Sequence, residues 1–485
     1  MTAMGSIFGQ SGRRSVFSAA IACAFLAAIC ATVDAQTTTN TGTNGTTTTG
    51  TGSATGVGTG TNVIASNTPF INVVGGVSIN TDGLLSNVTA DALGMLKKAR
   101  VESLEQVPDA LNGVSATRKV SLRRLEETIV ECVRNNKPLP DAVKYLAGLQ
   151  HVEYVFVYPE QKDIVLVGFG EGWEVNDQGA VVGITTRRPV MLLDDLLVAL
   201  RTAQAASQGG ITCSIDPTAE GLARLKGYLG EQKTMGDPDA TVNNIERALG
   251  IQNISVNGVP SGSHFARVLV AADYRMKRIA MAFDPSPVRG LPSYLQMAPA
   301  GRTVQTPRFW LEPRFEALLR DPDGLAWQLQ GASVKAMTEE DLATASGSIK
   351  HSGKANPVAQ KWADTMTHKY AELAAADSIF GQLQNCMELA VVGALVAKER
   401  LADKAGNSLP TLLDPSVVKT AEFSTPRQVE SKASVLKKGR HWVISASGGV
   451  AISSWELADM AKTSETVAAE RGKATPAAGS NWWWN

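Results

Sequence analysis

The spacing of apolar and polar residues predicts β-hairpins in three parts of the chain. Residues 152–158 and 163–169 are rich in Val, Tyr and Phe and are separated by a short turn, so we expect them to form a hairpin. Further hairpins are predicted at 173–184 and at 442–453, the second with its turn at Gly448-Gly449. These hairpins indicate antiparallel sheets.

Apolar residues three and four positions apart predict helices over much of the remaining chain. The expected helices span 89–107, 121–135, 140–149, 189–206, 219–229, 240–249, 263–282, 355–376 and 378–402. Between them, 308–312 is predicted to be a strand that pairs with 326–329. The fold class is therefore α+β, with antiparallel hairpin sheets packed against helices.

The N-terminal residues follow a different pattern. Arg13 and Arg14 precede an apolar run and a small-residue cleavage site, so residues 1–35 are predicted to be a signal peptide. The paired arginines leave both the general secretory and the twin-arginine routes open. Residues 36–68 consist largely of Thr, Gly and Asn and are predicted to be a disordered linker. We therefore expect an exported protein of the periplasm, cell envelope or extracellular space.

The length of the remaining chain predicts two or three subdomains behind this Thr/Gly-rich leader. The expected segments are an α+β domain at 69–208, an α/β-like domain at 209–345, a helical pair with a C-terminal hairpin at 346–461, and a flexible tail at 462–485. No segment after the leader combines sufficient length with an absence of charge, so we expect no transmembrane segment in the mature chain.

Composition argues against several functions. Lys+Arg 46 balance Asp+Glu 46, so no net field attracts a phosphate backbone, and we expect no nucleic-acid partner. Cys132, Cys213 and Cys386 each lie among apolar residues at helical or strand spacing and are predicted to be buried thiols. The five histidines lack metal-ligand spacing. We therefore predict no metal and no cofactor.

Catalytic motifs are also missing from the sequence. It contains no phosphate-binding Gly-x-x-x-x-Gly-Lys-Ser/Thr loop, no Gly-x-Ser-x-Gly elbow and no His-Glu-x-x-His pair. The glycine-rich run at 168–172 joins two predicted hairpin strands and opens no helix, so it does not suit a phosphate site. The sequence thus favours a protein without catalytic activity and leaves the question open.

The first candidate site combines mixed charge with an aromatic side chain that we expect to be exposed, an arrangement suited to a sugar or a peptide. It comprises Glu171, Trp173, Arg187, Arg188, Asp194 and Asp195. In the alternative interpretation the aspartates only stabilise the start of a helix, and the indole packs inside. The second candidate is a basic stripe opposite the apolar face of the helix at 263–282, for which a solvated face is the alternative. It comprises His264, Arg267, Arg275 and Arg278, with Tyr274 and Lys277 alongside.

The third candidate is the C-terminal run Trp482, Trp483 and Trp484. Three adjacent indoles at a chain end are hard to bury, so an exposed adhesive tail is one interpretation and a tail folded back onto the body is the other.

Four short segments together resemble a known family. They are Glu171-Gly172-Trp173, Arg188-Pro189-Val190 with 193–196, 265–277, and Lys361-Trp362-Ala363-Asp364. They resemble a domain-of-unknown-function family of exported proteins best known from planctomycete bacteria, over roughly residues 70–460. The resemblance implies export and a bacterial host and assigns no catalytic residue.

Two functions follow from these patterns. We favour a non-catalytic binding or interaction protein of the periplasm or cell envelope, with an envelope protein or glycan as its partner. The alternative is an exported hydrolase of envelope polymers that uses Glu171 with Asp194 or Asp195 as acid and base. Hydrolysis of a glycosidic bond requires two carboxyl groups about 5–10 Å apart across a cleft.

Overall fold

The computed structural model describes residues 73–231, 237–297, 304–305, 307–343, 349–351, 356–434, 442–443 and 447–475. The predicted signal peptide 1–35, the linker 36–68 and the tryptophan run 482–484 lie outside these residues. The description below concerns the compact unit from Thr61 to Asn485.

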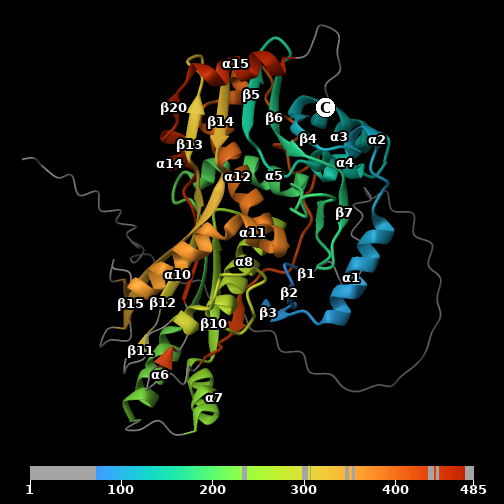
Figure 1. The fold of residues 1–485 in the computed structure, drawn as a ribbon. Coiled ribbons are helices and arrows are strands. Elements are labelled where there is room, and N and C mark those ends of the chain that lie inside the picture. Colours follow the sequence, from blue (N-terminus) through green and yellow to red (C-terminus); the bar gives the residue numbers. More distant parts are fainter. Residues whose placement is uncertain are drawn as a thin grey trace, which may run out of the picture. The chain divides into compact units, whose positions relative to one another are not determined.

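The largest sheet in the described part of the chain has ten strands (Figure 1). In spatial order these are β1 (Val73–Val74), β2 (Val77–Ile79), β3 (Leu84–Asn87), β17 (Gln428–Glu430), β10 (Ile251–Asn257), β9 (Ile211–Pro217), β19 (Ser447–Ile452), β12 (Pro307–Arg314), β15 (Ser333–Ala343) and β16 (Ile349–His351). Neighbouring strands are antiparallel except for β3 with β17 and β12 with β19.

A second sheet has six strands, again among the described residues. Its order is β20 (Lys462–Thr463), β13 (Ala317–Arg320), β14 (Ala326–Gln330), β5 (Tyr154–Tyr158), β6 (Asp163–Gly170) and β4 (Ser115–Ser121). Two further pairs are β7 (Trp173–Val175) with β8 (Val181–Gly183), and β11 (Val304–Gln305) with β18 (Trp442–Val443). Together with the helices, these open sheets confirm the predicted α+β class.

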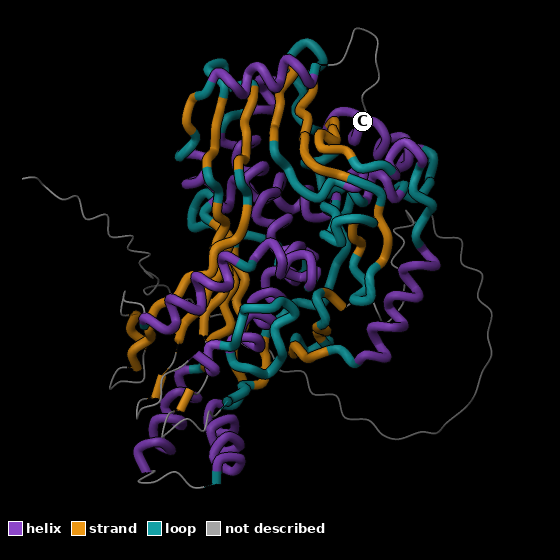
Figure 2. The backbone as a smooth tube through the Cα atoms, in the orientation of Figure 1, coloured by secondary structure: helices purple, strands orange, loops and turns teal. Residues whose placement is uncertain are grey.

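Helices lie beside the sheets (Figure 2). They are α1 (Ala90–Ser103), α2 (Asp109–Asn112), α3 (Leu122–Arg134), α4 (Asp141–Lys144), α5 (Leu193–Ala206), α6 (Ala219–Glu231), α7 (Pro238–Leu249), α8 (His264–Ala280), α9 (Tyr294–Met297), α10 (Pro357–His368), α11 (Tyr370–Ala376), α12 (Ser378–Lys398), α13 (Leu401–Ala405), α14 (Ser454–Asp459) and α15 (Glu465–Ala474). The predicted helix at 140–149 is shorter, because α4 is followed only by the 3₁₀ turn Leu146–Gly148.

Local chemistry explains where several helices begin. Thr89 caps α1 by accepting a hydrogen bond from Ala92 N, and Ser263 caps α8 by accepting one from Ala266 N at 3.1 Å. Asp237 caps α7, whose first residue is the proline favoured at that position. The predicted start at Pro189 is wrong, because 190–192 run extended, with Met191 N donating to Leu149 O, before α5 begins.

The two hairpins predicted in the N-terminal half are confirmed. Strand β5 pairs antiparallel with β6 from Tyr154 opposite Val167 to Tyr158 opposite Asp163, and β7 pairs antiparallel with β8. Both depend on contacts between segments that are close in sequence, where alternation and turn residues determine the pairing.

Two predicted pairings are wrong. The strand at 326–329 does not pair with 308–312; it is part of β14, which pairs with β13 and β5, whereas β12 pairs with β15 and β19. The hairpin at 442–453 does not form either, since Gly448 and Gly449 lie inside β19, which pairs with β12 and β9, and β18 pairs with β11. Pairing between distant segments leaves no local signal in the sequence.

Helix α12 lies at the centre of the main apolar core and packs against α5, α8, α11 and α14. Among the described residues it is the one helix long and apolar enough to cross a membrane, with a mean hydropathy of 1.4, but 94% of that stretch is buried within the protein. Its apolar surface is thus covered by neighbouring elements. Cys386 lies on this helix, and Cys132, Cys213 and Cys386 are all buried and free, as predicted.

Strands from all three segments predicted as domains lie in the ten-stranded sheet. Strands β1 to β3 come from 69–208, β9, β10, β12 and β15 come from 209–345, and β16, β17 and β19 come from 346–461. One apolar cluster extends from Val74 to Ala458. The segments thus share both a sheet and a core.

Candidate functional site

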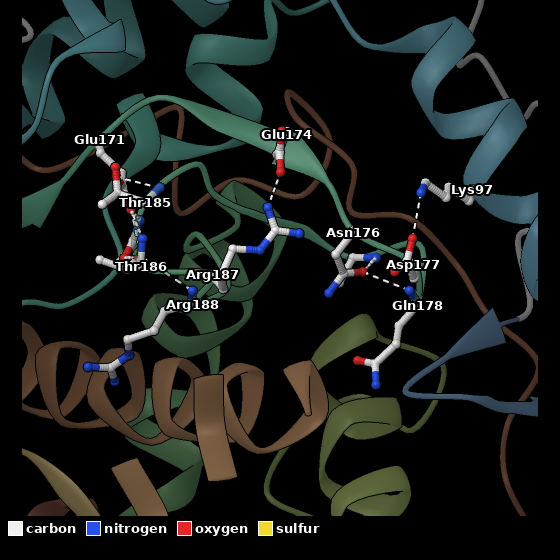
Figure 3. Close-up of polar contacts among 12 residues, drawn as sticks. Lys97, Glu171, Glu174, Asn176, Asp177, Gln178, Thr185, Thr186, Arg187 and Arg188 are labelled. Carbon is white, nitrogen blue, oxygen red and sulfur yellow. Dashed lines mark hydrogen bonds and ion pairs between the residues drawn. The ribbon is translucent and has the colours of Figure 1, made fainter. Parts of the chain in front are cut away.

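Glu171, in the link between β6 and β7, is the centre of a buried polar network (Figure 3). Its Oε1 accepts hydrogen bonds from Gln150 Nε2 and Thr186 N, both at 2.9 Å, and its Oε2 accepts one from Thr185 N at 3.0 Å. The Thr186 hydroxyl lies 2.6 Å from both Glu171 Oε1 and Gln150 Oε1. These contacts occupy both oxygens of the carboxylate.

The network decides what Glu171 can do chemically. Burial by itself raises its pKa, but the hydrogen bonds from Thr186, Gln150 and Thr185 outweigh burial and lower the pKa to about 2. A carboxyl group with this pKa carries no proton near neutral pH, so it does not suit a general acid. Gly183 permits the arrangement, because a Cβ there would overlap Gln150 Nε2 and Glu171 Oε1. Glu171 therefore anchors the β7–β8 hairpin.

Trp173 was expected to be exposed, and this expectation is wrong. Only 2% of the residue is exposed, and its ring lies 6.0 Å from the ring of Tyr145. The side chains of Trp173 and Val175 both point inward from β7, so the hairpin buries the indole as part of the main core. The alternative interpretation, in which the indole packs inside, describes its position.

Arg187 and Arg188, which follow β8, have different partners. Arg187 is exposed and forms an ion pair with Glu174 on β7 (Figure 3). Arg188 Nη2 donates to Gln384 Oε1 at 2.9 Å, and Gln384 Nε2 donates to Glu388 Oε1 at 2.9 Å. Arg188 is thus connected to polar residues of α12 that lie inside the protein.

Glu388 is 1% exposed and forms an ion pair with His151, whose Nδ1 lies 2.9 Å from Glu388 Oε2. The same oxygen accepts a hydrogen bond from Val152 N at 3.0 Å. Burial lowers the pKa of His151, but the charge and hydrogen bond of Glu388 outweigh it and raise that pKa. Burial likewise raises the pKa of Glu388, and His151, Val152 N and Gln384 together lower it. The pair holds α12 to the residues that precede β5.

The structure brings together one residue from each of the first two candidate sites. Asp195, in the first turn of α5, is hydrogen-bonded to His264, whose Nδ1 lies 3.0 Å from both carboxylate oxygens. Burial first, and the charge of Asp195 next, raise the pKa of Cys386 well above its usual value. This buried thiol is therefore poorly suited to act as a nucleophile.

Asp194 has a different hydrogen-bond partner from Asp195. Its Oδ2 accepts Ala421 N at 3.1 Å, and burial raises the pKa of this carboxyl group. Glu171, Asp194 and Asp195 therefore have separate hydrogen-bond partners.

The second candidate site is not an exposed basic stripe. Arg267 is fully buried, and His264 and Lys277 are each 8% exposed. Burial lowers the pKa of Arg267 to about 10, and its Nη1 donates to Ser424 O at 3.0 Å. Helix α8 is covered on both faces, by β9 and β19 as well as by α12. Helical spacing identified the apolar face correctly but did not reveal that the opposite face is also covered.

Lys277 connects three elements. Its Nζ donates to Asp273 Oδ2 at 2.9 Å, to Ile215 O at 3.1 Å and to Gly448 O at 3.2 Å. Asp273 is fully buried, and burial raises its pKa to about 6 although the charge and hydrogen bond of Lys277 oppose this. Three acceptors therefore account for all three ammonium protons.

Arg275 and Arg278 lie nearer the surface and are ion-paired. Arg278 forms a two-pronged contact with Asp284, with Nε to Oδ2 and Nη2 to Oδ1 both at 2.8 Å. Arg275 contacts Asp284 as well, and its Nε donates to Asp377 Oδ2 at 2.8 Å. Both arginines are thus matched by carboxylates.

A small pocket lies beside the C-terminal half of α8, and we refer to it as the α8 pocket. It has a volume of about 40 Å³. Its lining consists of Ile215, Gln252, Tyr274, Lys277, Arg278, Met281, Phe283, Glu430 and Lys432. Gln252 is 7% exposed, and within the described part of the chain its Nε2 has no hydrogen-bond partner. A buried amide without a partner is costly, and it is therefore a feature expected where a ligand binds.

Sequence patterns missed Gln252, His151, Gln384 and Glu388. Two of them carry a weak signal. Gln252 alternates with Ile254 on a strand whose exposed face is formed by the intervening residues, so a polar side chain occupies an inward position. Glu388 interrupts the long apolar helix α12. Among the described residues, no group of three or more His, Cys, Asp or Glu side chains could hold a metal ion.

Comparison with known proteins finds similarity to a family over part of the chain. Residues 213–294 match a family described as "Protein of unknown function (DUF1598)". The match supports the expected similarity to a domain-of-unknown-function family over part of the range 70–460. It runs from β9 through α6, α7, β10 and α8 to the first residue of α9, and it contains most of the residues that line the α8 pocket. No curated protein and no solved structure matches the chain.

Proposed function

We propose that this chain is an exported, non-catalytic binding protein of the periplasm or cell envelope of a planctomycete bacterium, and that the α8 pocket is its ligand site. Export is supported by the basic, apolar and small-residue pattern of residues 1–35. The observation that carries the binding role is Gln252, a buried donor without a partner among the described residues, in the wall of a pocket.

The surroundings of the three carboxylates favour binding over hydrolysis. A glycosidase needs one carboxyl group that stays protonated near neutral pH and a second that is ionised across a cleft. Glu171 has a pKa of about 2 and is surrounded by hydrogen-bond donors, while Asp195 is engaged by His264. Each carboxylate is thus held by a structural partner of its own. We therefore rank the hydrolase below the binding protein.

Export is tested by N-terminal sequencing of the protein recovered from fractionated cells. We expect the mature chain to begin near Gln36, outside the cytosol. An intact leader on a cytosolic product would contradict the proposal.

Binding is tested by sedimenting purified cell envelopes with the mature protein over a range of concentrations. We expect saturable binding that weakens in Gln252→Met, which keeps the side-chain length and removes the amide donor. The matched control is Asn253→Met on the next residue of β10, which is exposed on the other face of the strand. Absence of saturable binding would contradict the binding role, and equal binding by both variants would exclude the α8 pocket. Release of soluble envelope fragments by the wild-type protein, lost in a Glu171→Gln variant that is still folded, would instead support the hydrolase.

A further inference from the structure

The size of the α8 pocket limits what can enter it. A volume of about 40 Å³ is above the roughly 10–15 Å³ that a cavity needs to hold one water molecule, so the pocket is small. A whole sugar ring or an amino-acid residue is larger than this. The pocket therefore suits one small group of a ligand, with the rest of the molecule outside it.

The charges around the pocket are already balanced. Lys277 is paired with Asp273, and Arg278 is paired with Asp284 through two hydrogen bonds. At the rim, Lys432 Nζ lies 3.4 Å from Glu246 Oε2 and 3.8 Å from Glu430 Oε2. A ligand carboxylate would therefore find no cation without a carboxylate partner, and burying an unmatched charge is costly. The pocket favours a neutral group.

The pocket thus offers a ligand one hydrogen-bond donor, the amide of Gln252, beside apolar side chains. Gln252 presents a buried amide nitrogen whose partner is missing among the described residues, and Ile215 and Met281 are almost fully buried apolar neighbours. Tyr274 and Phe283 are partly exposed, and the carboxylate of Glu430 is an exposed acceptor. The complementary group is small and neutral, with one hydrogen-bond acceptor, a methyl-sized apolar end and a donor directed outward.

We propose that the α8 pocket binds an acetamido group, the N-acetyl unit of an amino sugar or of an acetylated amine. The carbonyl oxygen accepts the hydrogen bond from Gln252 Nε2, the methyl group packs against Ile215 and Met281, and the N–H faces Glu430 at the rim. This assignment rests on the proposed binding role of the same pocket. It names the part of an envelope ligand that the protein recognises.

The test is ligand-observed saturation-transfer NMR on the mature protein, with N-acetylglucosamine as the probe and glucose as the matched sugar without the acetamido group. We expect the acetyl methyl protons to receive the largest saturation and glucose to receive none above background. In Gln252→Met the dissociation constant for N-acetylglucosamine should rise about tenfold, which is the loss expected for one hydrogen bond. Asn253→Met should bind as the wild-type protein does, and equal unfolding temperatures of the two variants control for folding.

N-acetylglycinamide distinguishes the two sources of the group. Binding as tight as that of N-acetylglucosamine identifies an acetylated amine without a sugar requirement, and weaker binding identifies an amino sugar; both outcomes support the assignment. Glucose binding as tightly as N-acetylglucosamine, no saturation of the acetyl methyl group, or an unchanged dissociation constant in Gln252→Met would overturn it. Saturable envelope binding that depends on Gln252, but that N-acetylglucosamine and N-acetylglycinamide both fail to inhibit, would leave the proposed function intact and refute only the ligand class.

Discussion

The ion pair of His151 and Glu388 makes part of the stability of this protein depend on pH. Because the folded-state pKa of His151 is raised, the stabilisation is complete below the ordinary histidine value of 6.5 and is lost as the pH rises through the folded value. The lowered pKa of Glu388 sets the acid limit, since its contribution is present above 4.5 and is lost as the pH falls through the folded value. The pair therefore stabilises most between these two values.

Glu388→Gln removes the charge while keeping the shape of the side chain. We expect it to lower the free energy of unfolding by about 1–3 kcal/mol near pH 6, and by less at pH 8.5, because His151 loses its proton as the pH rises. Urea unfolding at both pH values measures the difference. Glu372→Gln, which disturbs an exposed pair with Lys369, is the control and should change stability by less than about 0.5 kcal/mol. A loss in Glu388→Gln that is equal at both pH values would contradict this role of the pair.

The lowered pKa of Glu171 predicts that the protein loses stability in acid. Its pKa of about 2 lies below the ordinary value of 4.5, so its contribution is present above 4.5 and is lost as the pH falls toward 2. Glu171→Gln should cost about 2 kcal/mol at neutral pH and should flatten the decline of stability in this acid range. Chemical denaturation between pH 2 and pH 7 tests this. An acid decline as steep as that of the wild-type protein would show that another group causes it.

At this scale the sequence located residues more reliably than it described their roles. Glu171, Arg188, Asp195 and His264 were all named as candidates, and the structure places all four in polar networks. Their partners come from residues up to 196 positions away, as with Arg188 and Gln384, so spacing along the chain could not reveal them. Charged residues predicted to lie on the surface are instead buried by such partners.

The pairing of β12 with β19 brings the backbones of the two strands very close together. Gly448 has a φ of +136°, and a Cβ there would overlap the carbonyl oxygen of Phe309. Its own carbonyl accepts a hydrogen bond from Lys277, so α8 meets the sheet at the same point. A side chain at this position would therefore separate the strands and disturb the wall of the α8 pocket.

Gly448→Ala should lower the free energy of unfolding by about 3 kcal/mol or more, because it combines backbone strain with overlap. Gly472→Ala is the control, since Gly472 lies in α15 with open space around the added Cβ, and it should leave stability unchanged or raise it by up to about 1 kcal/mol. Thermal unfolding of both variants provides the comparison. A Gly448→Ala protein as stable as the wild type would show that β12 and β19 can separate without cost.

The same strands show why elements were easier to predict than their arrangement. The β5–β6 hairpin was predicted correctly because both strands and their turn lie within residues 152–169. Strand β12 was also predicted as a strand, but its partner β19 lies more than 130 positions later, and its sequence Ser-Gly-Gly-Val-Ala-Ile resembles a turn followed by a strand. Glycines that permit a close approach between strands cannot be distinguished in a sequence from glycines that form a turn.

For the whole molecule, the shared sheet determines how the chain unfolds. Strands β9 and β12, from the predicted domain at 209–345, both pair with β19 from the last segment, and α8 packs against α12. We expect residues 69–475 to unfold in one transition whose calorimetric and van't Hoff enthalpies agree. Separate transitions would instead indicate independent domains.

A fragment of residues 209–345 tests the same claim more directly. It contains the whole DUF1598 match and ends at a predicted boundary, yet it lacks β19 between β9 and β12, β17 beside β10, and α12 against α8. Its buried strands would expose unpaired backbone groups and apolar side chains, so we expect no cooperative unfolding transition and a near-ultraviolet circular dichroism spectrum without fine structure. Residues 69–475 provide the folded control. If the fragment folds cooperatively and retains the acetyl-methyl saturation of N-acetylglucosamine, the binding site does not need the sheet that the rest of the chain completes.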